Sequence, residues 1–178
     1  DRMGANPWNG VKALKEKLKH NAVLMQIPIG SEENFQGVVD LITLKAWYFD
    51  GSNGEIVRIE ECPAELLEKA QEEREAMLEA LADFDDDLME KAMEGEFDKI
   101  TDDQIHNAVT VGVRSLKLTP VYMGSAFKNK GVQPLLDAVS RYLPSPLTCD
   151  KPKAIDSNTN KTLDLLPHSE KTSLAMAS

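Results

Sequence analysis

The chain has 178 residues, of which 42% are apolar, and this is enough for one sizeable hydrophobic core with a small appended lobe. No apolar run approaches the ~18 residues of a membrane span, so we expect no contact with the bilayer interior. The two cysteines, Cys62 and Cys149, stand far apart, which indicates a reducing compartment and argues against a disulfide framework or a zinc site.

The formal net charge of −10 is unevenly distributed along the chain. The segment from Glu60 to Glu96 holds 15 acidic residues against Lys69, Arg74 and Lys91, a net −12, so the rest of the chain carries +2. Because like charges repel, we expect this segment to face a basic protein surface or water, and not RNA phosphates.

The chain begins with a loop that leads into a helix. Asn6 is a favoured N-cap, and Pro7 suits the first helical position because its missing N–H would have no intrahelical partner there. The predicted apolar face is formed by residues at helical spacing: Trp8, Val11, Leu14 and Leu18. We expect this helix to cover a sheet and to hold the loop of Asp1 in place.

The next segments predict a small antiparallel sheet. Residues 22–29 form one expected strand, followed by apolar runs at 37–42 and 45–49 and an alternating segment at 55–59. The turn residues between Gly51 and Gly54 predict a hairpin. We expect the neighbouring aromatic residues, Trp47, Tyr48 and Phe49, to pack this hairpin against a helix and not to stack on bases.

The longest helix is expected from Pro63 to about Ala82. Its apolar stripe comprises Leu66, Leu67, Ala70, Met77, Leu78 and Leu81. Five glutamates fall three or four residues apart on another face: Glu65, Glu68, Glu72, Glu75 and Glu79. A solvated face is the ordinary interpretation of such a run, and a docking surface for a basic partner is the alternative.

Two shorter helices follow. One runs from Asp85 to Met93 and ends at Gly95. The other begins at a capping box between Thr101 and Gln104 and is expected to reach Leu116. Its expected inward residues are Ile105, Ala108, Val109, Gly112, Val113 and Leu116. The three histidines, His20, His106 and His168, lack ligand spacing with cysteines or paired carboxylates, so we expect no metal site.

A strand, a loop and a helix are expected in this order between Val121 and Tyr142. Val121–Met123 is a short apolar run, Gly124–Gly131 is rich in small and polar residues, and Pro134 opens a helical pattern. The apolar face of that helix comprises Leu135, Leu136, Val139 and Tyr142. Such a loop presents backbone donors at the carboxyl edge of a sheet, and the N–H groups of Ser125, Ala126 and Phe127 suit O6 of a guanine base.

Several of these segments resemble elongation factor G in order along the chain. Gly124–Gln133, the helix after it and Tyr142–Pro146 resemble the last guanine-recognition motif of that family. Asp1–Asn6 resembles the end of the family's N-K-x-D-R-M-G motif. The resemblance to the mitochondrial form is carried by Asn21-Ala22, Gln26–Pro28 and the stretch from Tyr48–Gly51 through Pro63–Leu66.

The resemblance implies an α/β fold. Residues 1–29 and 117–146 would form the C-terminal part of a P-loop GTPase domain. Residues 30–116 would form an inserted α+β subdomain with a small antiparallel sheet and acidic helices. Residues 147–178 would hold a polar linker at 150–161 and, at Ser173–Ala177, the truncated first strand of a following β-barrel domain.

The resemblance also implies a GTPase that drives tRNA and mRNA through the ribosome, with GTP or GDP as its cofactor. The phosphate loop, the switch regions and the Mg2+ ligands are expected upstream, so we assign no catalytic or metal residue here and expect this segment alone to be inactive. The carboxylate of Asp1 would accept hydrogen bonds from N1–H and the 2-amino group of guanine. Adenine lacks that amino group, which would favour GTP over ATP.

The implied partner of the acidic helix is the C-terminal domain of the ribosomal stalk protein, with Glu65, Glu68, Glu72, Glu75 and Glu79 as candidate contacts. Contacts to tRNA and mRNA would come from other domains of a monomer. The mitochondrial matrix is the expected location, with the bacterial cytoplasm as the alternative. Two other functions stay open, a ribosome-recycling paralogue and a free-standing acidic interaction module.

Overall fold

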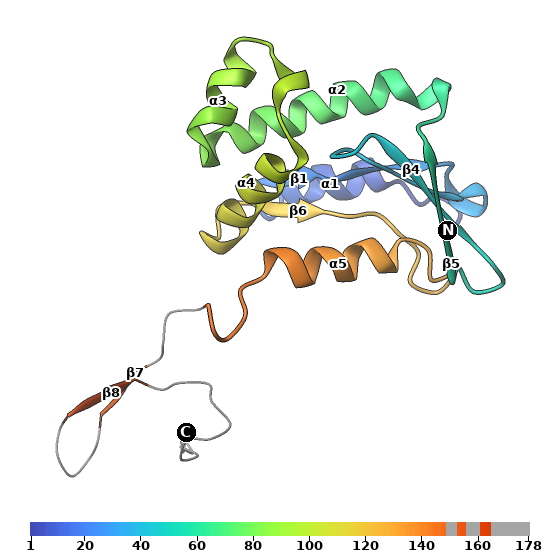
Figure 1. Ribbon diagram of the computed structural model, residues 1–178. Coiled ribbons are helices and arrows are strands. Elements are labelled where there is room, and N and C mark those ends of the chain that lie inside the picture. The colour runs from blue at the N-terminus through green and yellow to red at the C-terminus, as the bar shows by residue number, and fades with distance from the viewer. Residues whose placement is uncertain (149–152, 156–160, 165–178) are drawn as a thin grey trace. The chain divides into compact units, whose positions relative to one another are not determined.

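The computed structural model describes residues 1–148, 153–155 and 161–164 (Figure 1). The contacts separate residues 1–143 from a second unit that begins at Pro144. The first unit has mixed α/β structure, as predicted. Its main elements are α1 (Pro7–Glu16), β1 (Ala22–Leu24), β2 (Gln26–Ile29), β3 (Gly37–Asp40), β4 (Lys45–Asp50), β5 (Ile56–Glu61), α2 (Ala64–Leu81), α3 (Asp86–Met93), α4 (Asp102–Arg114), β6 (Thr119–Val121) and α5 (Val132–Tyr142).

The predicted strand at 22–29 is two strands in two sheets. β1 pairs in parallel with β6, whereas β2 is the first strand of the antiparallel sheet β2-β3-β4-β5. The change occurs at the fully buried Met25, whose N–H donates to the carbonyl of Val121 at 3.0 Å and whose carbonyl accepts from the N–H of Leu41 at 3.0 Å. Met25 therefore bonds to both sheets, and the antiparallel sheet begins before the predicted boundary at Gly30.

One hydrophobic core joins the parallel strand pair to the antiparallel sheet and to the helices that follow it. It combines residues of β1 and β2 with residues of α2, α3, α4 and α5. Its fully buried side chains include Met25, Ile27, Leu41, Met77, Leu78, Leu81, Leu88 and Ile105. Residues 1–29, 30–116 and 117–143 therefore share one core.

The hairpin between β4 and β5 lies where the turn residues predict it, and Figure 1 shows the two strands side by side. The buried Phe49 of β4 packs in a second cluster with Val11 of α1, Val38 of β3 and Met123. The expectation that this aromatic segment packs against a helix is therefore confirmed for Phe49.

Helix α2 begins one residue after its predicted start at Pro63 and ends one residue before its predicted end at Ala82. Ala70, Met77, Leu78 and Leu81 are buried as expected, whereas Leu67 is exposed. The guanidinium of Arg74 donates to the carbonyls of Leu41, at 2.6 Å, and of Ile42. Burial lowers the pKa of Arg74, and its hydrogen bonds tie α2 to the turn after β3.

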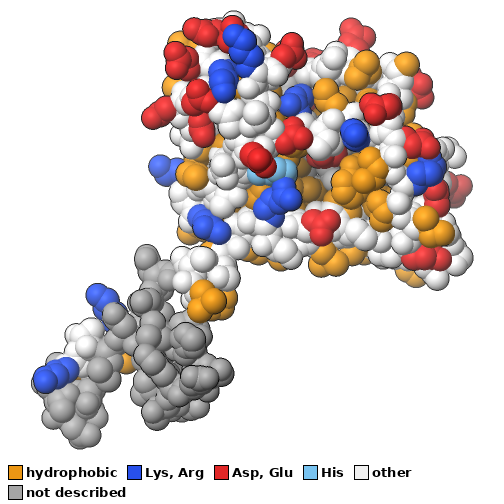
Figure 2. Space-filling model, in the orientation of Figure 1, with side chains coloured by type: hydrophobic (Ala, Val, Ile, Leu, Met, Phe, Trp, Pro, Cys, Tyr) orange, Lys and Arg blue, Asp and Glu red, His pale blue; other side chains and the backbone are white. Residues whose placement is uncertain are grey.

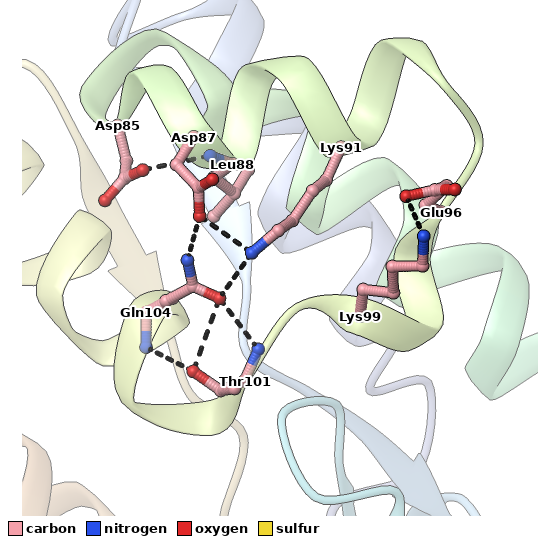
Figure 3. A network of polar contacts seen from close by, with 8 residues as sticks. All are labelled: Asp85, Asp87, Leu88, Lys91, Glu96, Lys99, Thr101 and Gln104. Carbon is pink, nitrogen blue, oxygen red and sulfur yellow. Dashed lines mark hydrogen bonds and ion pairs between the residues drawn. The ribbon is translucent and has the colours of Figure 1, made fainter.

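Helices α3 and α4 are joined by the polar network in Figure 3. Asp85 caps α3 by accepting from the N–H of Leu88 at 2.9 Å, and the predicted capping box of Thr101 and Gln104 begins α4. Asp87 accepts from the ammonium of Lys91 at 2.7 Å and from the amide of Gln104. These two hydrogen bonds lower the pKa of Asp87.

Other expected inward residues lie outside the core. Leu18 follows the end of α1 and is 61% exposed, and Leu116 follows α4 in a left-handed conformation (φ 59°) and is 93% exposed. Helix α5 also turns a different face inward. Its buried residues are Pro134, Ala138 and Tyr142, whereas Leu135, Leu136 and Val139 are exposed. Apolar residues lie on two sides of α5, so periodicity alone did not identify the buried one.

The second unit contains a short antiparallel pair, β7 (Lys153–Ile155) and β8 (Thr162–Asp164). Residues 153–155 of the predicted polar linker at 150–161 thus form a strand. Cys149 and the predicted strand Ser173–Ala177 lie outside the described residues. Among the described residues, none of the helices has the length and apolar character needed to cross a bilayer.

Candidate functional site

The two loops that resemble guanine motifs meet in the structure. The hydroxyl of Ser125 donates to Oδ2 of Asp1 at 2.5 Å, although the two residues are 124 positions apart. Ser125 is only 4% exposed, and Asp1 is partly buried. The first loop leads into α1 and the second follows β6, so the parallel pairing of β1 with β6 brings the two together.

The second loop closes on itself through Ser125. The N–H of Ser125 donates to the carbonyl of Lys130 at 2.8 Å, and the N–H of Lys130 returns a bond of 3.0 Å. The hydroxyl of Ser125 also accepts from the N–H of Lys128 at 3.2 Å. The backbone N–H of Ser125 is therefore engaged, contrary to the expectation that it is free for a ligand. Sequence reasoning missed the side chain, which orients the carboxylate of Asp1.

The next two residues retain free backbone donors. In the part of the chain that the structure describes, the N–H groups of Ala126 and Phe127 have no acceptor. Both residues are exposed, and the side chain of Phe127 is 97% exposed. The loop therefore holds two unpaired N–H donors directly after Ser125.

A cleft of about 550 Å3 opens beside Asp1. Its walls come from the first loop, from α1, from the turn after β2 and from the segment after β6. They include Asp1, Ala5, Pro7, Val11, Pro28, Phe35, Met123 and Gly124. The cleft is lined mainly by apolar residues and by two carboxylates, those of Asp1 and Glu32, whereas Ser125, Ala126 and Phe127 do not line it. Such a cleft suits a flat heteroaromatic ring that carries N–H donors on one edge.

The five glutamates of α2 are all exposed. Within the described residues, none of Glu65, Glu68, Glu72, Glu75 and Glu79 forms an ion pair or accepts a hydrogen bond. Figure 2 shows acidic side chains gathered along the top left of the molecule, over α2 and α3. These carboxylates are available to a partner in solution.

A second polar cluster lies between α4 and α5. Nδ1 of His106 and the hydroxyl of Tyr142 are 2.7 Å apart. Burial and the neighbouring Arg141 lower the pKa of His106, whereas burial raises the pKa values of Tyr122 and Asp40. These shifts all favour neutral side chains, so the cluster acts as a packed polar contact. Across the described residues, His, Cys, Asp and Glu form no group suited to a metal ion.

No family model matches the chain. Among curated proteins, elongation factor G 1 of Borreliella afzelii (strain PKo) is 54% identical over 166 residues, which is 93% of this chain and 24% of that protein. Elongation factor G 1 of Borreliella burgdorferi is 51% identical over 178 residues, and that of Syntrophus aciditrophicus is 46% identical over 177, each over 99% of this chain and 25% of the relative. The chain belongs to the elongation factor G family. It spans about a quarter of the length of these relatives.

A solved structure supports the same fold. The crystal structure of a Thermus thermophilus protein matches with a TM-score of 0.68 at 28% identity, over 84% of this chain and 22% of that one. The predicted resemblance to the mitochondrial form is not supported, because these elongation factor G relatives come from bacteria.

Proposed function

We propose that this chain is part of a translation elongation GTPase and that it supplies the guanine-recognition loops. The observation that carries the proposal is the hydrogen bond from Ser125 to Asp1, which joins two loops that resemble guanine motifs. The membership of this chain in the elongation factor G family favours a role in translation over that of a free-standing acidic interaction module.

The chemistry of the site follows from its donors and acceptors. Ser125 donates to Oδ2 of Asp1. Each carboxylate oxygen carries two lone pairs, so Oδ1 and the second lone pair of Oδ2 remain for a base. Guanine offers N1–H and a 2-amino group on adjacent atoms, which a carboxylate accepts together. The N–H groups of Ala126 and Phe127 would meet O6 of guanine, where adenine carries an amino donor instead. Both contacts would therefore select guanine over adenine.

In the whole protein, GTP hydrolysis would drive the movement of tRNA and mRNA through the ribosome. The phosphate loop, the Mg2+ ligands and the switches would lie in the other three quarters of such a factor, so the 178 residues alone would neither bind GTP tightly nor hydrolyse it. The bacterial relatives favour action in a bacterial cytoplasm. The factor would act there on the ribosome as a monomer.

Nucleotide selectivity of the whole factor tests this proposal. Titration with fluorescent GDP and ADP should give a dissociation constant for ADP at least 100-fold higher, because ADP loses charge-assisted hydrogen bonds to Asp1 worth roughly 1.5–3 kcal/mol each. Comparable affinity for both nucleotides would overturn the proposal.

The exposed acidic face of α2 would dock the C-terminal domain of the ribosomal stalk protein. We expect the triple charge reversal Glu68→Lys, Glu72→Lys and Glu75→Lys to weaken that binding by roughly 10- to 100-fold at low salt, since each exposed charge pair contributes about 0.5–1 kcal/mol. The loss should shrink as ionic strength rises above about 0.15 M, because exposed charges are screened. Calorimetric titration with the isolated stalk domain measures it.

The control is a second triple variant, with the same change in net charge at residues outside α2. Glu16→Lys, Glu33→Lys and Asp137→Lys alter three exposed carboxylates on other elements. This variant should bind the stalk domain like the wild type. Equal affinity of both triple variants and the wild type would remove the docking role from α2.

A further inference from the structure

The insertion contacts the loop that carries Asp1. Residues 2–6 of this loop are exposed, so burial contributes little to its order. The N–H of Gly4 donates to the carboxylate of Glu32 at 2.7 Å, a bond between residues 28 positions apart. Within the described residues, this bond and that of Asp1 to Ser125 are the two hydrogen bonds that tie the loop to distant parts of the chain.

Glu32 lies in a turn with an uncommon backbone conformation. Its φ of 52° is in the left-handed region, which costs most side chains roughly 1 kcal/mol or more and which glycine adopts freely. The turn between β2 and β3 thus places a carboxylate, and not a glycine, at this position. Such strained residues persist where the surrounding structure holds them.

The insertion also contacts the loop of Ser125. The ammonium of Lys130 donates to the carbonyl of Phe35 at 3.1 Å, and the side-chain amide of Gln133 donates to the carbonyl of Gly54 at 3.1 Å. Phe35 belongs to the same turn as Glu32, and Gly54 is at the tip of the β4–β5 hairpin. One turn therefore holds both loops.

The hairpin tip packs directly on the second loop. A Cβ atom at Gly54 would lie 2.7 Å from the carbonyl oxygens of Lys128 and Asn129, and φ at Gly54 is 62°. Only glycine permits both the conformation and this approach. The hairpin of the insertion thus supports the loop along its backbone.

We propose that the insertion positions the guanine site, with Glu32 holding the loop of Asp1 and Lys130 anchoring the loop of Ser125. This inference rests on the proposed function. Loops held in their binding geometry before the ligand arrives lose less conformational entropy on binding, which raises affinity. Glu32 and Lys130 are positioning residues, since each acts through a backbone group and not on the base.

Inosine diphosphate separates the two roles. It keeps O6 but lacks the 2-amino group of guanine, so the ratio of GDP to IDP affinity in the whole factor reports on the contact with Asp1. Glu32→Ala should weaken GDP binding by about threefold to tenfold, because the loop of Asp1 loses the hydrogen bond that holds it. The ratio of GDP affinity to IDP affinity should fall as well. Lys130→Met should weaken the binding of both GDP and IDP, because the loop of Ser125 supplies the donors to O6, which both nucleotides carry.

Conservative variants distinguish positioning from a general loss of structure. Glu32→Gln keeps an acceptor oxygen for Gly4 and should restore most of the GDP affinity and the ratio. Glu33→Ala, a change of the same kind at the exposed neighbouring residue, should match the wild type. Wild-type affinity in Glu32→Ala, or equal losses in Glu32→Ala and Glu33→Ala, would overturn the inference.

Asp1→Ala in the same assay separates the two proposals. A lower GDP affinity in Asp1→Ala together with wild-type behaviour of Glu32→Ala would leave the proposed function standing and overturn only the positioning role. Unchanged GDP affinity in Asp1→Ala would overturn the proposed function and the inference with it. In the background of Asp1→Ala, the further change Glu32→Ala should leave the GDP-to-IDP ratio unaltered, because the contact it positions is gone.

Discussion

Replacing Asp1 with alanine should weaken GDP binding to the whole factor by roughly 10²- to 10⁴-fold. The carboxylate would lose two hydrogen bonds to guanine, each worth roughly 1.5–3 kcal/mol when one partner is charged, and a tenfold change in affinity corresponds to about 1.4 kcal/mol. ADP binding should change little, since adenine presents no matching pair of donors to Asp1. The measurement is a competition titration of a fluorescent nucleotide with GDP and with ADP.

A gain of function provides the control for this substitution. Asp1→Asn replaces one acceptor oxygen with an amide that donates, which opposes the 2-amino group of guanine but matches the 2-oxo group of xanthine. This variant should therefore prefer xanthosine diphosphate over GDP, a result that a misfolded protein would not give. Wild-type GDP affinity in both variants would show that Asp1 does not contact the base.

Local sequence was sufficient where local contacts decide the structure. The N-cap at Asn6 and the capping box of Thr101 and Gln104 were predictable because each satisfies backbone donors within three residues. The hairpin before Glu55 was predictable from its turn residues. The positions of these elements along the chain therefore followed from the amino acids alone.

Contacts between distant segments were not predictable in this way. The division of residues 22–29 at Met25 depends on hydrogen bonds to Leu41 and Val121, which periodicity within the strand does not encode. The buried face of α5 depends in the same way on its packing against α4, in which His106 contacts Tyr142. Only the three-dimensional arrangement decides between two apolar faces of one helix.

In the candidate site too, the contacts between distant residues did not follow from local sequence patterns. The family resemblance predicted that the loops of Asp1 and Ser125 belong to one guanine site, although no local pattern links residues 124 positions apart. The hydrogen bond between their side chains was not predicted. The engagement of the N–H of Ser125 was missed, since it depends on the closure of the loop onto Lys130. Glu32 has no distinguishing sequence signal, being one of 30 acidic residues in the chain. Its hydrogen bond to Gly4 appears only in the folded chain.

The second large effect concerns stability. Leu78 of α2 is 0% exposed in the core that joins β1, β2 and the helices. Leu78→Ala should lower the free energy of unfolding by about 2–5 kcal/mol, because the substitution removes buried methyl groups and leaves a cavity. The same change at the exposed Leu67, on the same helix, should cost less than about 1 kcal/mol. Urea titration of the 178-residue chain measures both values.

Because the core is shared, we expect the parts of the chain that it joins to unfold together. The chain has two tryptophans, Trp8 on α1 and Trp47 on β4 of the antiparallel sheet. Trp47→Phe therefore leaves Trp8 as the reporter for α1, and Trp8→Phe leaves Trp47 as the reporter for the antiparallel sheet. If one core holds both regions, Leu78→Ala should shift the two fluorescence transitions to lower urea by the same amount, and the transitions should coincide. A transition of Trp47 at a urea concentration well below that of Trp8 would mean that the antiparallel sheet unfolds separately. The antiparallel sheet would then be too loosely coupled to hold the loops of Asp1 and Ser125 at a fixed spacing.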